Sequence, residues 1–371
     1  MIKKISFKNF KIFKSEQILE LRPITILIGK NNSGKSAIAK LPTMIAGSLS
    51  GRFSAPINLE NDGVRIGLSY EDLFYNREIT GEALEFCIEN DTEKLDILIS
   101  GDRRYNINIS KYLLNGVDID IKKTKLNGFL SKENPLKSLS LDFDYIDSFR
   151  KFPEPQFSDI YAEYNKIGTS GENAYKLLAQ YHKETNPLLS RIKTWFKENF
   201  EGWEIGVRDI VSSISSYEIV LSTPKLKPIN IVNTGSGIRQ SLPLIVRSFM
   251  PVETETLIII EEPETHLHPA AHGNLAQRFV ESYLEDNNRH YLIETHSQNF
   301  VLRMRRLIAE RKELKPEDVA IYYVDFDENE NKSTLHLIEV DKEGDVAWWP
   351  SGIFNESLDE VIELRKAQDA L

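Results

Sequence analysis

A glycine-rich loop directly after an apolar stretch constrains the fold of this 371-residue chain more than any other sequence feature. Residues 29–36 read Gly-Lys-Asn-Asn-Ser-Gly-Lys-Ser and fit the pattern G-x-x-x-x-G-K-S. The stretch 24–28 before the loop reads as a buried strand, and the stretch 37–46 after it suits a helix. Because a strand, this loop and a helix in this order form the context that the pattern needs, we expect an α/β fold of the P-loop NTPase type.

The residue types of this loop suit a nucleoside triphosphate bound together with a magnesium ion. Glycines let backbone N–H groups close around phosphate oxygens, and the following helix adds the positive end of its dipole. Lys35 would reach the terminal phosphates, and the hydroxyl of Ser36 would ligate Mg²⁺. We therefore expect ATP and Mg²⁺ as ligands. The residues expected to contact the nucleotide here are Gly29, Lys30, Asn31, Asn32, Ser33, Gly34, Lys35, Ser36 and Ala37.

A second apolar stretch, 257–260, ends in two adjacent acids, Glu261 and Glu262. A strand without polar residues is typical of a parallel sheet that helices cover on both faces, and such sheets bind ligands at the carboxyl ends of their strands. Glu261 would hold the magnesium ion through its water shell, and Glu262 would accept the proton of the attacking water. The alternative is two solvated glutamates, but buried strands seldom end in paired acids unless a cation balances them.

The rest of the chain divides into segments with different periodicities. The start alternates as an antiparallel hairpin does, 50–145 is strand-like with turn-rich breaks, and helical periodicity appears between 157 and 200. We therefore expect one domain with an N-terminal antiparallel β-lobe and a helical insert. Its expected parts are a lobe with the phosphate-binding loop (1–156), the helical insert (157–202), a lobe with the acidic strand (203–314) and a C-terminal hairpin and helix (315–371).

Composition restricts the partners of the protein. The net charge of −10 argues against a protein that coats nucleic acid over most of its surface, although local basic patches leave nucleic acid as a possible partner. The single cysteine, Cys87, permits no internal disulfide and no multi-cysteine zinc site. No apolar run approaches the roughly 20 residues of a membrane span, so we expect a cytoplasmic protein without a membrane partner. The candidate basic residues are Lys3, Lys4, Lys8, Lys11, Lys14, Lys122, Lys123, Lys125, Arg303, Arg305, Arg306, Arg311 and Lys312.

Together with two further motifs, the loop and the acidic strand resemble the ABC-type ATPases, and within them the SMC and OLD-like branch of bacterial ATPases of DNA repair and phage defence. Residues 234–243, Thr-Gly-Ser-Gly-Ile-Arg-Gln-Ser-Leu-Pro, look like the signature of that family. In the family this signature opens a helix and touches the γ-phosphate held by the opposite subunit. The resemblance therefore implies that Ser236 and Gly237 complete the ATP site of a second copy, in a homodimer or a higher homo-oligomer.

The second further motif follows a later strand. Residues 293–297, Ile-Glu-Thr-His-Ser, match the switch-histidine segment of the family. Residues 262–269, Glu-Pro-Glu-Thr-His-Leu-His-Pro, resemble the segment after the acids in OLD-like ATPases, where it contributes to the dimer interface. The resemblance implies three catalytic residues, namely Lys35, Glu262 and His296.

Two positions depart from the pattern of the family. Glu261 stands where most ABC ATPases carry aspartate, which keeps the magnesium role but lengthens the reach of the side chain. The loop glutamine that usually adds a magnesium contact is not assigned to any residue. The segment 345–354, which contains Trp-Trp-Pro, resembles a C-terminal tail of unknown function in bacterial ATPases of this group.

Two other metal chemistries compete for parts of the chain. His266, His268 and His272 have spacings that a zinc site could use, but the phosphate-binding loop already explains this region. OLD-like nucleases join such an ATPase to a metal-dependent Toprim nuclease domain, and Asp325 and Asp327 could match its D-x-D motif. The upstream glutamate-glycine signature of that domain is missing, so an acidic hairpin turn is the preferred interpretation.

The sequence therefore favours an ATPase whose two ATP sites are completed across a head-to-tail dimer, used as a switch or sensor in DNA maintenance or anti-phage defence. The alternative is a nucleotide-gated scaffold that hydrolyses ATP slowly and recruits a separately encoded effector, such as a nuclease or toxin. Steady turnover stimulated by DNA favours the first, whereas turnover that appears only with a genetic neighbour favours the second. A self-contained OLD-like nuclease ranks lowest.

Overall fold

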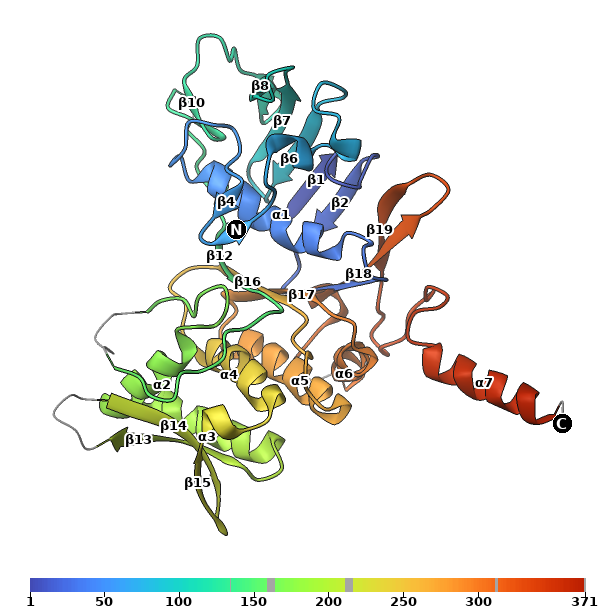
Figure 1. Cartoon of the computed structure of the whole chain (residues 1–371). Helices are drawn as coiled ribbons and strands as arrows, with labels where there is room; N and C mark the ends of the chain where they lie inside the picture. The colour runs from blue at the N-terminus through green and yellow to red at the C-terminus, as the bar shows by residue number, and fades with distance from the viewer. Residues whose placement is uncertain (134, 159–163, 211–215, 311–312, 370–371) are drawn as a thin grey trace.

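The fold is organised around a six-stranded central sheet (Figure 1). The computed structural model describes residues 1–133, 135–158, 164–210, 216–310 and 313–369. In spatial order the strands of this sheet are β12 (Asp142–Ile146), β16 (Thr256–Glu261), β17 (Arg289–Glu294), β3 (Ile24–Ile28), β18 (Val319–Asp327) and β19 (Lys332–Ile338). The first five pair in parallel, and β19 is antiparallel to β18. The α/β class expected from the sequence is confirmed.

Both faces of the central sheet are buried, and alternate residues of its strands enter two different cores. In β3, Ile24, Ile26 and Ile28 pack into the core on one face, whereas Leu27 packs into the core on the other. The residues 257–260 of β16 alternate between the two cores in the same way. Because successive side chains of a strand point to opposite faces, a strand covered on both sides has no position for an exposed polar residue. A polar side chain inside such a strand therefore needs a buried partner, as Asp144 of β12 has in Arg247.

One face of the central sheet is covered by α1 (Lys35–Leu49) and by a six-stranded antiparallel sheet, which lies above it in Figure 1. The expected antiparallel β-lobe and its opening hairpin are thereby confirmed. The strands of the lobe are, in spatial order, β2 (Gln17–Glu20), β1 (Lys4–Lys8), β6 (Leu84–Glu89), β7 (Lys94–Gly101), β8 (Ile107–Leu114) and β9 (Val117–Asp118). Two short hairpins join β4 (Glu60–Asn61) to β5 (Val64–Arg65) and β10 (Leu126–Asn127) to β11 (Leu130–Ser131).

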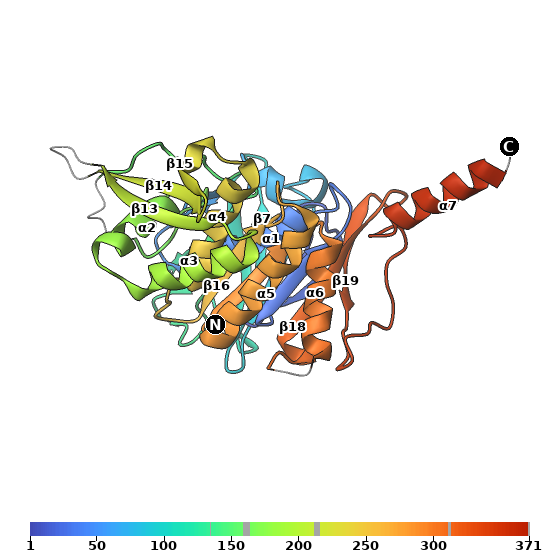
Figure 2. The same cartoon turned by 90° about the horizontal axis from the view of Figure 1, so that it is seen from below.

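Helices cover the opposite face of the central sheet, and a small antiparallel sheet packs outside them (Figure 2). The helices are α2 (Ala174–Lys183), α3 (Pro187–Asn199), α4 (Ser236–Phe249), α5 (Pro269–Glu285) and α6 (Gln298–Ala309). The outer sheet contains β13 (Glu204–Ile210), β14 (Ser216–Thr223) and β15 (Leu226–Asn230). In the expected insert the first described helix begins at Ala174, after a turn in which Gly168 and Gly171 have positive φ angles of 84° and 68°.

The C-terminal segment opens with the β18–β19 hairpin, which confirms the predicted acidic turn. The carboxylate of Asp327 accepts hydrogen bonds from the backbone N–H groups of Asn329 and Glu330, and Asp325 accepts one from the Tyr323 hydroxyl at 2.9 Å. The last helix, α7 (Glu356–Asp369), stands away from the body of the protein in both views (Figures 1 and 2). Among the described residues, no helix combines the length and the apolar composition that crossing a membrane requires.

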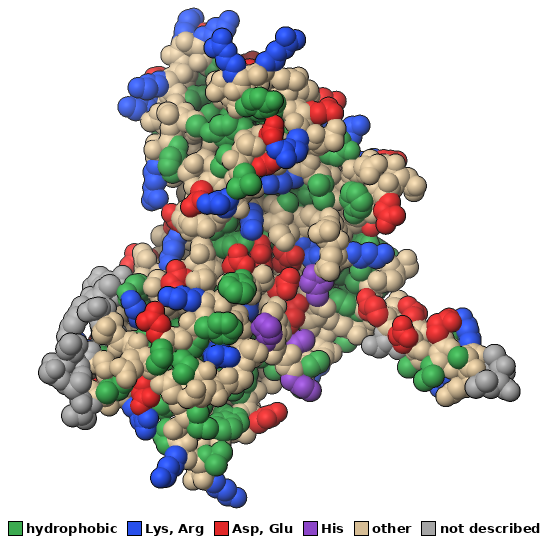
Figure 3. Space-filling view, in the orientation of Figure 1, with side chains coloured by type: hydrophobic (Ala, Val, Ile, Leu, Met, Phe, Trp, Pro, Cys, Tyr) green, Lys and Arg blue, Asp and Glu red, His purple; other side chains and the backbone are tan. Residues whose placement is uncertain are grey.

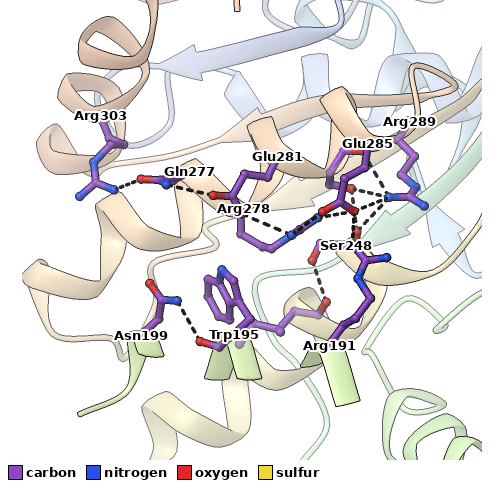
Figure 4. Close-up of polar contacts among 12 residues, drawn as sticks. Arg191, Trp195, Asn199, Ser248, Gln277, Arg278, Glu281, Glu285, Arg289 and Arg303 are labelled. Carbon is purple, nitrogen blue, oxygen red and sulfur yellow. Dashed lines mark hydrogen bonds and ion pairs between the residues drawn. The ribbon is translucent and has the colours of Figure 1, made fainter. Parts of the chain in front are cut away.

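A network of arginines fastens α3, α4 and α5 to the start of β17 (Figure 4). The side chains of Arg278 and Arg289 are only 3% and 7% exposed, and both form ion pairs with Glu285, at 2.9 Å and 3.6 Å. Arg191 of α3 reaches the same carboxylate at 2.8 Å, and Arg289 also donates a hydrogen bond to the backbone oxygen of Ser248 in α4. Burial acts to raise the pKa of Glu285, but the charges of Arg278 and Arg191 outweigh it and lower this pKa. One carboxylate thus contacts three guanidinium groups, while Glu281 and Asp286 each pair with one of them.

We expect Glu285→Ala to lower the free energy of unfolding by roughly 3–5 kcal/mol, because removing one partner leaves buried charges uncompensated. Since the pKa of Glu285 is lowered by folding, its contribution is present above its unfolded pKa of about 4.3 and is lost as the pH falls through the lower folded value. Glu281→Ala on the same helix is the matched control. The Glu281 side chain is 38% exposed, pairs with Arg278 at 3.3 Å and accepts a hydrogen bond from Gln277, so its loss should cost less than about 1 kcal/mol. Denaturant unfolding at pH 7 measures both variants, and equal losses would contradict the central role of Glu285.

Candidate functional site

The candidate site lies where three neighbouring parallel strands end. β16, β17 and β3 lie side by side, and their register places Glu261 beside Glu294 and Glu294 beside Leu27. The loop 29–36 follows β3 directly. Figure 3 shows acidic and histidine side chains gathered in the middle of the visible face, between the N-terminal lobe and the helices. Residues from distant parts of the sequence therefore meet at one edge of the sheet.

The backbone of the phosphate-binding loop requires glycine at both ends of the motif. Gly29 has a φ of 152°, and a side chain there would overlap the carbonyl oxygen of Val324. Gly34 has a φ of 102°, and a Cβ atom there would lie 2.8 Å from the side chain of Ile12. Gly34 also precedes α1 without a side-chain cap, which leaves the first N–H groups of the helix available to an anion. The Lys35 side chain is buried, and its ammonium donates hydrogen bonds to the carbonyl oxygens of Gly29 and Lys30, at 3.1 Å and 2.8 Å.

The carboxylate nearest to the loop is Glu294, which ends β17. Its Oε1 atom accepts a hydrogen bond from the Ser36 hydroxyl at 3.2 Å and lies 3.8 Å from the Lys35 ammonium. Its Oε2 atom is buried and has no hydrogen-bond partner among the described residues. The sequence pattern gave this glutamate no role in the nucleotide site. Its position at the end of a strand was visible in the sequence, but its closeness to Ser36 depends on the strand order.

Glu261 ends β16 at the same edge. Its carboxylate accepts a hydrogen bond of 2.5 Å from the Tyr145 hydroxyl and lies 3.9 Å from the Lys40 ammonium. Ser36, which we expected to share a magnesium ion with Glu261, is hydrogen-bonded to Glu294 instead. Glu261 and Glu294 nevertheless end adjacent strands, and Ser36 contacts Glu294. An ion bound near the Ser36 hydroxyl would therefore lie close to carboxylates.

Glu262 and His296 face each other across the same edge. Ligand atoms of Glu262, Glu294 and His296 all lie within 4.8 Å of one another. The backbone of Glu262 has a φ of 43°, and its N–H group donates to the carbonyl oxygen of Glu294 at 2.8 Å. Its side chain accepts a hydrogen bond from the Thr265 hydroxyl at 3.1 Å. The carboxylate of Glu264 accepts a hydrogen bond of 2.5 Å from the backbone N–H of His296 and so fixes the segment that carries the histidine.

The electrostatics of this edge favour a bound cation. Burial and the nearby charge of Glu261 raise the pKa of the Glu294 carboxyl to about 7, against the opposing effect of Lys35. Burial also raises the pKa of Glu261, and it lowers the pKa values of Lys35 and His296. Buried carboxylates that repel one another are stabilised by a positive ion, and hard oxygen ligands are those that magnesium prefers. The unpartnered Oε2 atom of Glu294 and the Ser36 hydroxyl therefore fit a divalent cation.

The raised pKa of Glu294 makes stability depend on pH in a defined direction. Because the folded-state pKa lies above the unfolded value of about 4.3, the folded protein binds more protons between these values, and its stability falls as the pH rises through about 7. Glu294→Gln removes this titration. Without nucleotide and divalent ions, the stability gain of the variant over the wild type should be about 1 kcal/mol larger at pH 8.5 than at pH 6.

Thermal or denaturant unfolding at the two pH values measures this difference. Glu328→Gln, in the exposed β18–β19 turn, is the control and should show no such change between the two values. A gain from Glu294→Gln that is the same at pH 6 and pH 8.5 would contradict the raised pKa.

The signature-like segment lies at the start of α4, away from the loop 29–36. Ser236 begins the helix, and a Cβ atom on Gly237 would lie 2.5 Å from the carbonyl oxygen of His266, so the helix start packs against the turn that follows Glu262. In the part of the chain that the structure describes, no hydrogen bond joins Ser236 or Gly237 to the phosphate-binding loop. Their expected contact with nucleotide therefore needs a second copy, and it stays a prediction.

Two of the three histidines considered for zinc have other partners, and the third is exposed. His268 caps α5 by accepting a hydrogen bond from the backbone N–H of Ala270, and His272 contacts the Ser297 hydroxyl at 2.8 Å. His266 is exposed, with a φ of 66°. Among the described residues, the only group of three or more metal-binding side chains whose ligand atoms converge is the Glu262, Glu294 and His296 set. The spacing of the histidines alone was therefore misleading.

Sequence reasoning also missed a fully buried arginine behind the acids. Arg150 lies in the loop after β12, the neighbour of β16 in the sheet, and its guanidinium donates to the backbone oxygens of Glu261 and Glu262. Gln240 of α4 binds the backbone of the same arginine. No local pattern links these residues, because the two side chains lie 90 positions apart in the sequence.

Comparison with known families agrees with this geometry. The stretch 24–303 matches the family described as "AAA domain, putative AbiEii toxin, Type IV TA system". The chain belongs to this family. The AAA-domain match covers the loop 29–36, both acids after β16 and the segment that contains His296. Residues 314–364 match a second family, described as a protein of unknown function, DUF3696.

One curated protein and one solved structure are similar to the chain. The chain is 23% identical over 364 residues to the Old nuclease of Escherichia phage P2, a match that covers 80% of this chain and 56% of that protein. The chain thus spans about half the length of this relative. A solved SMC head bound to the C-winged helix domain of ScpA is similar in fold, with a TM-score of 0.53 at 14% identity over 91% of this chain and 98% of that chain. The expected SMC and OLD-like ABC-type ATPase fold is confirmed.

Proposed function

We propose that this protein is a magnesium-dependent ATPase whose nucleotide state switches a dimer between open and closed forms. The observation that carries the proposal is the meeting of the loop 29–36 with Glu262, Glu294 and His296 at one edge of the central sheet. A magnesium ion bound there would offset the negative charge of the triphosphate. Membership of an AAA-domain family and the SMC-like fold support a nucleotide as the ligand.

The residues of the site divide the work of hydrolysis. Lys35 would exchange its contacts with the loop carbonyls for the terminal phosphates of ATP, while Ser36 and Glu261, helped by Glu294, would hold the cation. Glu262 would accept a proton as the oxygen of water bonds to the γ-phosphorus and the bond from this phosphorus to the bridging oxygen breaks, which yields ADP and inorganic phosphate.

His296 would act as a hydrogen-bond donor to the γ-phosphate. Burial is the main cause that lowers its pKa, and the charge of Lys35 adds to it, so the imidazole is neutral at physiological pH and keeps one N–H group. The backbone bond from His296 to Glu264 orients this donor toward the edge that carries Glu262. Neutrality also lets the histidine lie near Lys35 without adding a second positive charge.

Ser236 and Gly237 would complete the ATP site of a second copy. They begin α4, where backbone N–H groups suit a phosphate, and they have no hydrogen bond to the loop of their own chain among the described residues. A head-to-tail dimer would therefore contain two sites, each built from both subunits. Similarity to part of the Old nuclease supports a setting in DNA maintenance or anti-phage defence.

A nucleotide-gated scaffold is the second candidate function. Its support is α7, which stands away from the body and exposes Val361, Ile362 and Leu364. The SMC head in the similar structure binds a winged-helix domain of another protein, which supports a separately encoded effector as the partner here. Turnover that appears only with such a partner would favour the scaffold over an independent switch.

Glu262→Gln should lower the turnover of ATP by roughly 10²- to 10⁴-fold, because an amide cannot accept the proton of the attacking water. The affinity for ATP should stay within about threefold, since the loop and its cation ligands are unchanged. Lys35→Ala is the contrasting variant and should lose tight ATP binding, because it removes the charge directed at the phosphates. Phosphate release and calorimetry with ATP measure the two effects. Unchanged turnover in Glu262→Gln would remove Glu262 as the catalytic base.

The Glu262→Gln protein should also associate in a nucleotide-dependent way. ATP that binds to both chains at once stabilises the closed dimer, and ADP should release it. Adding Ser236→Arg should prevent the association through charge and bulk at the start of α4. Light scattering with ATP and with ADP measures the mass of each variant. An association state indifferent to nucleotide, or a double variant that still closes, would exclude this dimer while leaving ATP binding untouched.

A further inference from the structure

Arg150 is a buried cation whose charge is met by backbone oxygens. The residue is 0% exposed, and its Nη2 atom donates to the carbonyl oxygens of Glu261 and Glu262 at 2.8 Å and 2.9 Å. Within the described residues it forms no ion pair with a carboxylate at salt-bridge distance. Burial lowers the pKa of Arg150 to about 10, so the side chain remains charged at neutral pH. A buried guanidinium is costly unless its donors are used, and these two carbonyls bind its Nη2 atom. The negative charges of Glu264 and Asp147, which lie beyond salt-bridge distance, also oppose the lowering of its pKa.

The two carbonyls belong to the segment that carries the proposed catalytic base. Glu262 has a φ of 43°, a conformation that costs a residue with a side chain about 1–3 kcal/mol and persists only where the surroundings enforce it. Its peptide groups are held on both sides, by Glu294 at the N–H and by Arg150 at the carbonyl. The direction of the Glu262 side chain follows from this backbone, so Arg150 acts on the carboxylate without touching it.

The same arginine is fastened to α4. Gln240 accepts a hydrogen bond from the backbone N–H of Arg150 at 3.3 Å and donates one to its carbonyl oxygen at 2.9 Å. The Nη1 atom of Arg150 in turn lies 3.5 Å from the backbone oxygen of Gln240. Gln240 is buried and lies one helical turn after Ser236 at the start of α4. A shift of this helix end would therefore move Arg150 and, through it, the backbone of Glu262.

We propose that Arg150 is a positioning residue that fixes the backbone of Glu262 for attack by water, and that Gln240 makes this position depend on α4. The inference rests on the proposed ATPase function for its kinetic consequence. It goes beyond that function because it connects the start of α4, where a second copy would bind, to the carboxylate in the site of the same chain. Closure of the dimer at one ATP site would then fix the position of the catalytic base in the other ATP site.

Arg150→Lys tests the positioning role, with Arg247→Lys as the matched control. Lysine keeps the charge but cannot reach both carbonyls and α4 with a planar fork of donors. Arg247 is equally buried, lies on α4 and is paired with Asp144 of β12 at 2.5 Å, and no described bond joins it to the two acids. We expect Arg150→Lys to lower kcat by 10- to 100-fold with an ATP affinity within threefold of wild type. Arg247→Lys should lower the melting temperature but leave kcat within threefold.

Gln240→Met tests the link to α4 while the guanidinium stays in place. Methionine has a similar length but neither donates to nor accepts from the backbone of Arg150, so kcat should fall by 3- to 10-fold at unchanged ATP affinity. This variant also keeps the proposal testable if Arg150→Lys does not fold. Equal losses of kcat in Arg150→Lys and Arg247→Lys, or parallel losses of kcat and ATP affinity, would overturn the positioning role.

Hydrogen exchange of the nucleotide-free protein separates this inference from the proposed function. The backbone N–H groups of Glu262 and Thr265 are hydrogen-bonded in the segment that Arg150 holds. We expect the amides of 262–267 to exchange at least tenfold faster in Arg150→Lys than in wild type or Arg247→Lys. Equal exchange in all three proteins would overturn the proposal whether or not ATP is hydrolysed. If the wild type shows no ATP turnover, the proposed ATPase function is wrong. The exchange rates then test the positioning role of Arg150 by themselves.

Discussion

The parallel pairing of β3, β17 and β16 is the constraint on which the rest of the site depends. Both faces of these strands are buried, and the carboxylates of β16 and β17 stand at the strand ends. The register aligns the ends, which brings Glu261 and Glu294 next to each other and next to the loop that leaves β3. A shift of one residue in this pairing would turn both carboxylates into the cores. The apolar packing of the sheet therefore determines the geometry of the polar edge.

The aligned strand ends also create a surplus of buried negative charge. In the described structure this charge is balanced only in part, by Lys35 near Glu294 and by Lys40 and the Tyr145 hydroxyl near Glu261. Folding raises the pKa values of both carboxyls, which means that the folded state is less favourable for their ionised forms. A ligand that brings a cation would relieve this cost and stabilise the fold by its binding free energy. The same groups thus weaken the unliganded protein, and the metal-bound nucleotide that we propose as the ligand would relieve this effect.

Local patterns in the sequence predicted the structural elements that depend on neighbouring residues. They did not predict the contacts between segments that are far apart in the sequence. The loop 29–36, the hairpin at the start and the buried strand before Glu261 follow from short-range periodicity and glycine placement, and the structure contains all three. Glu294 was visible as a strand end, but its contact with Ser36 requires knowing that β17 lies between β16 and β3. The described helices of the expected insert, α2 and α3, lie within the range 157–202. Arg150 had no signal at all, since its partners lie about 90 to 110 residues away.

The buried Arg150 shows how the start of α4 can influence the backbone of Glu262. A carboxylate partner would hold the guanidinium in one place through a strong, localised charge interaction, whereas carbonyl oxygens bind it through the backbone of the residues that must be positioned. Arg150 therefore acts on the backbone conformation of Glu262 and not only on the charge of the Glu262 side chain. The φ of 43° at Glu262 leaves this backbone little freedom. Because Gln240 holds the opposite side of the same residue, a short, buried path of hydrogen bonds connects the start of α4 to the backbone of Glu262. The fold thus gives a displacement of one helix end a physical route to the carboxylates at the strand ends.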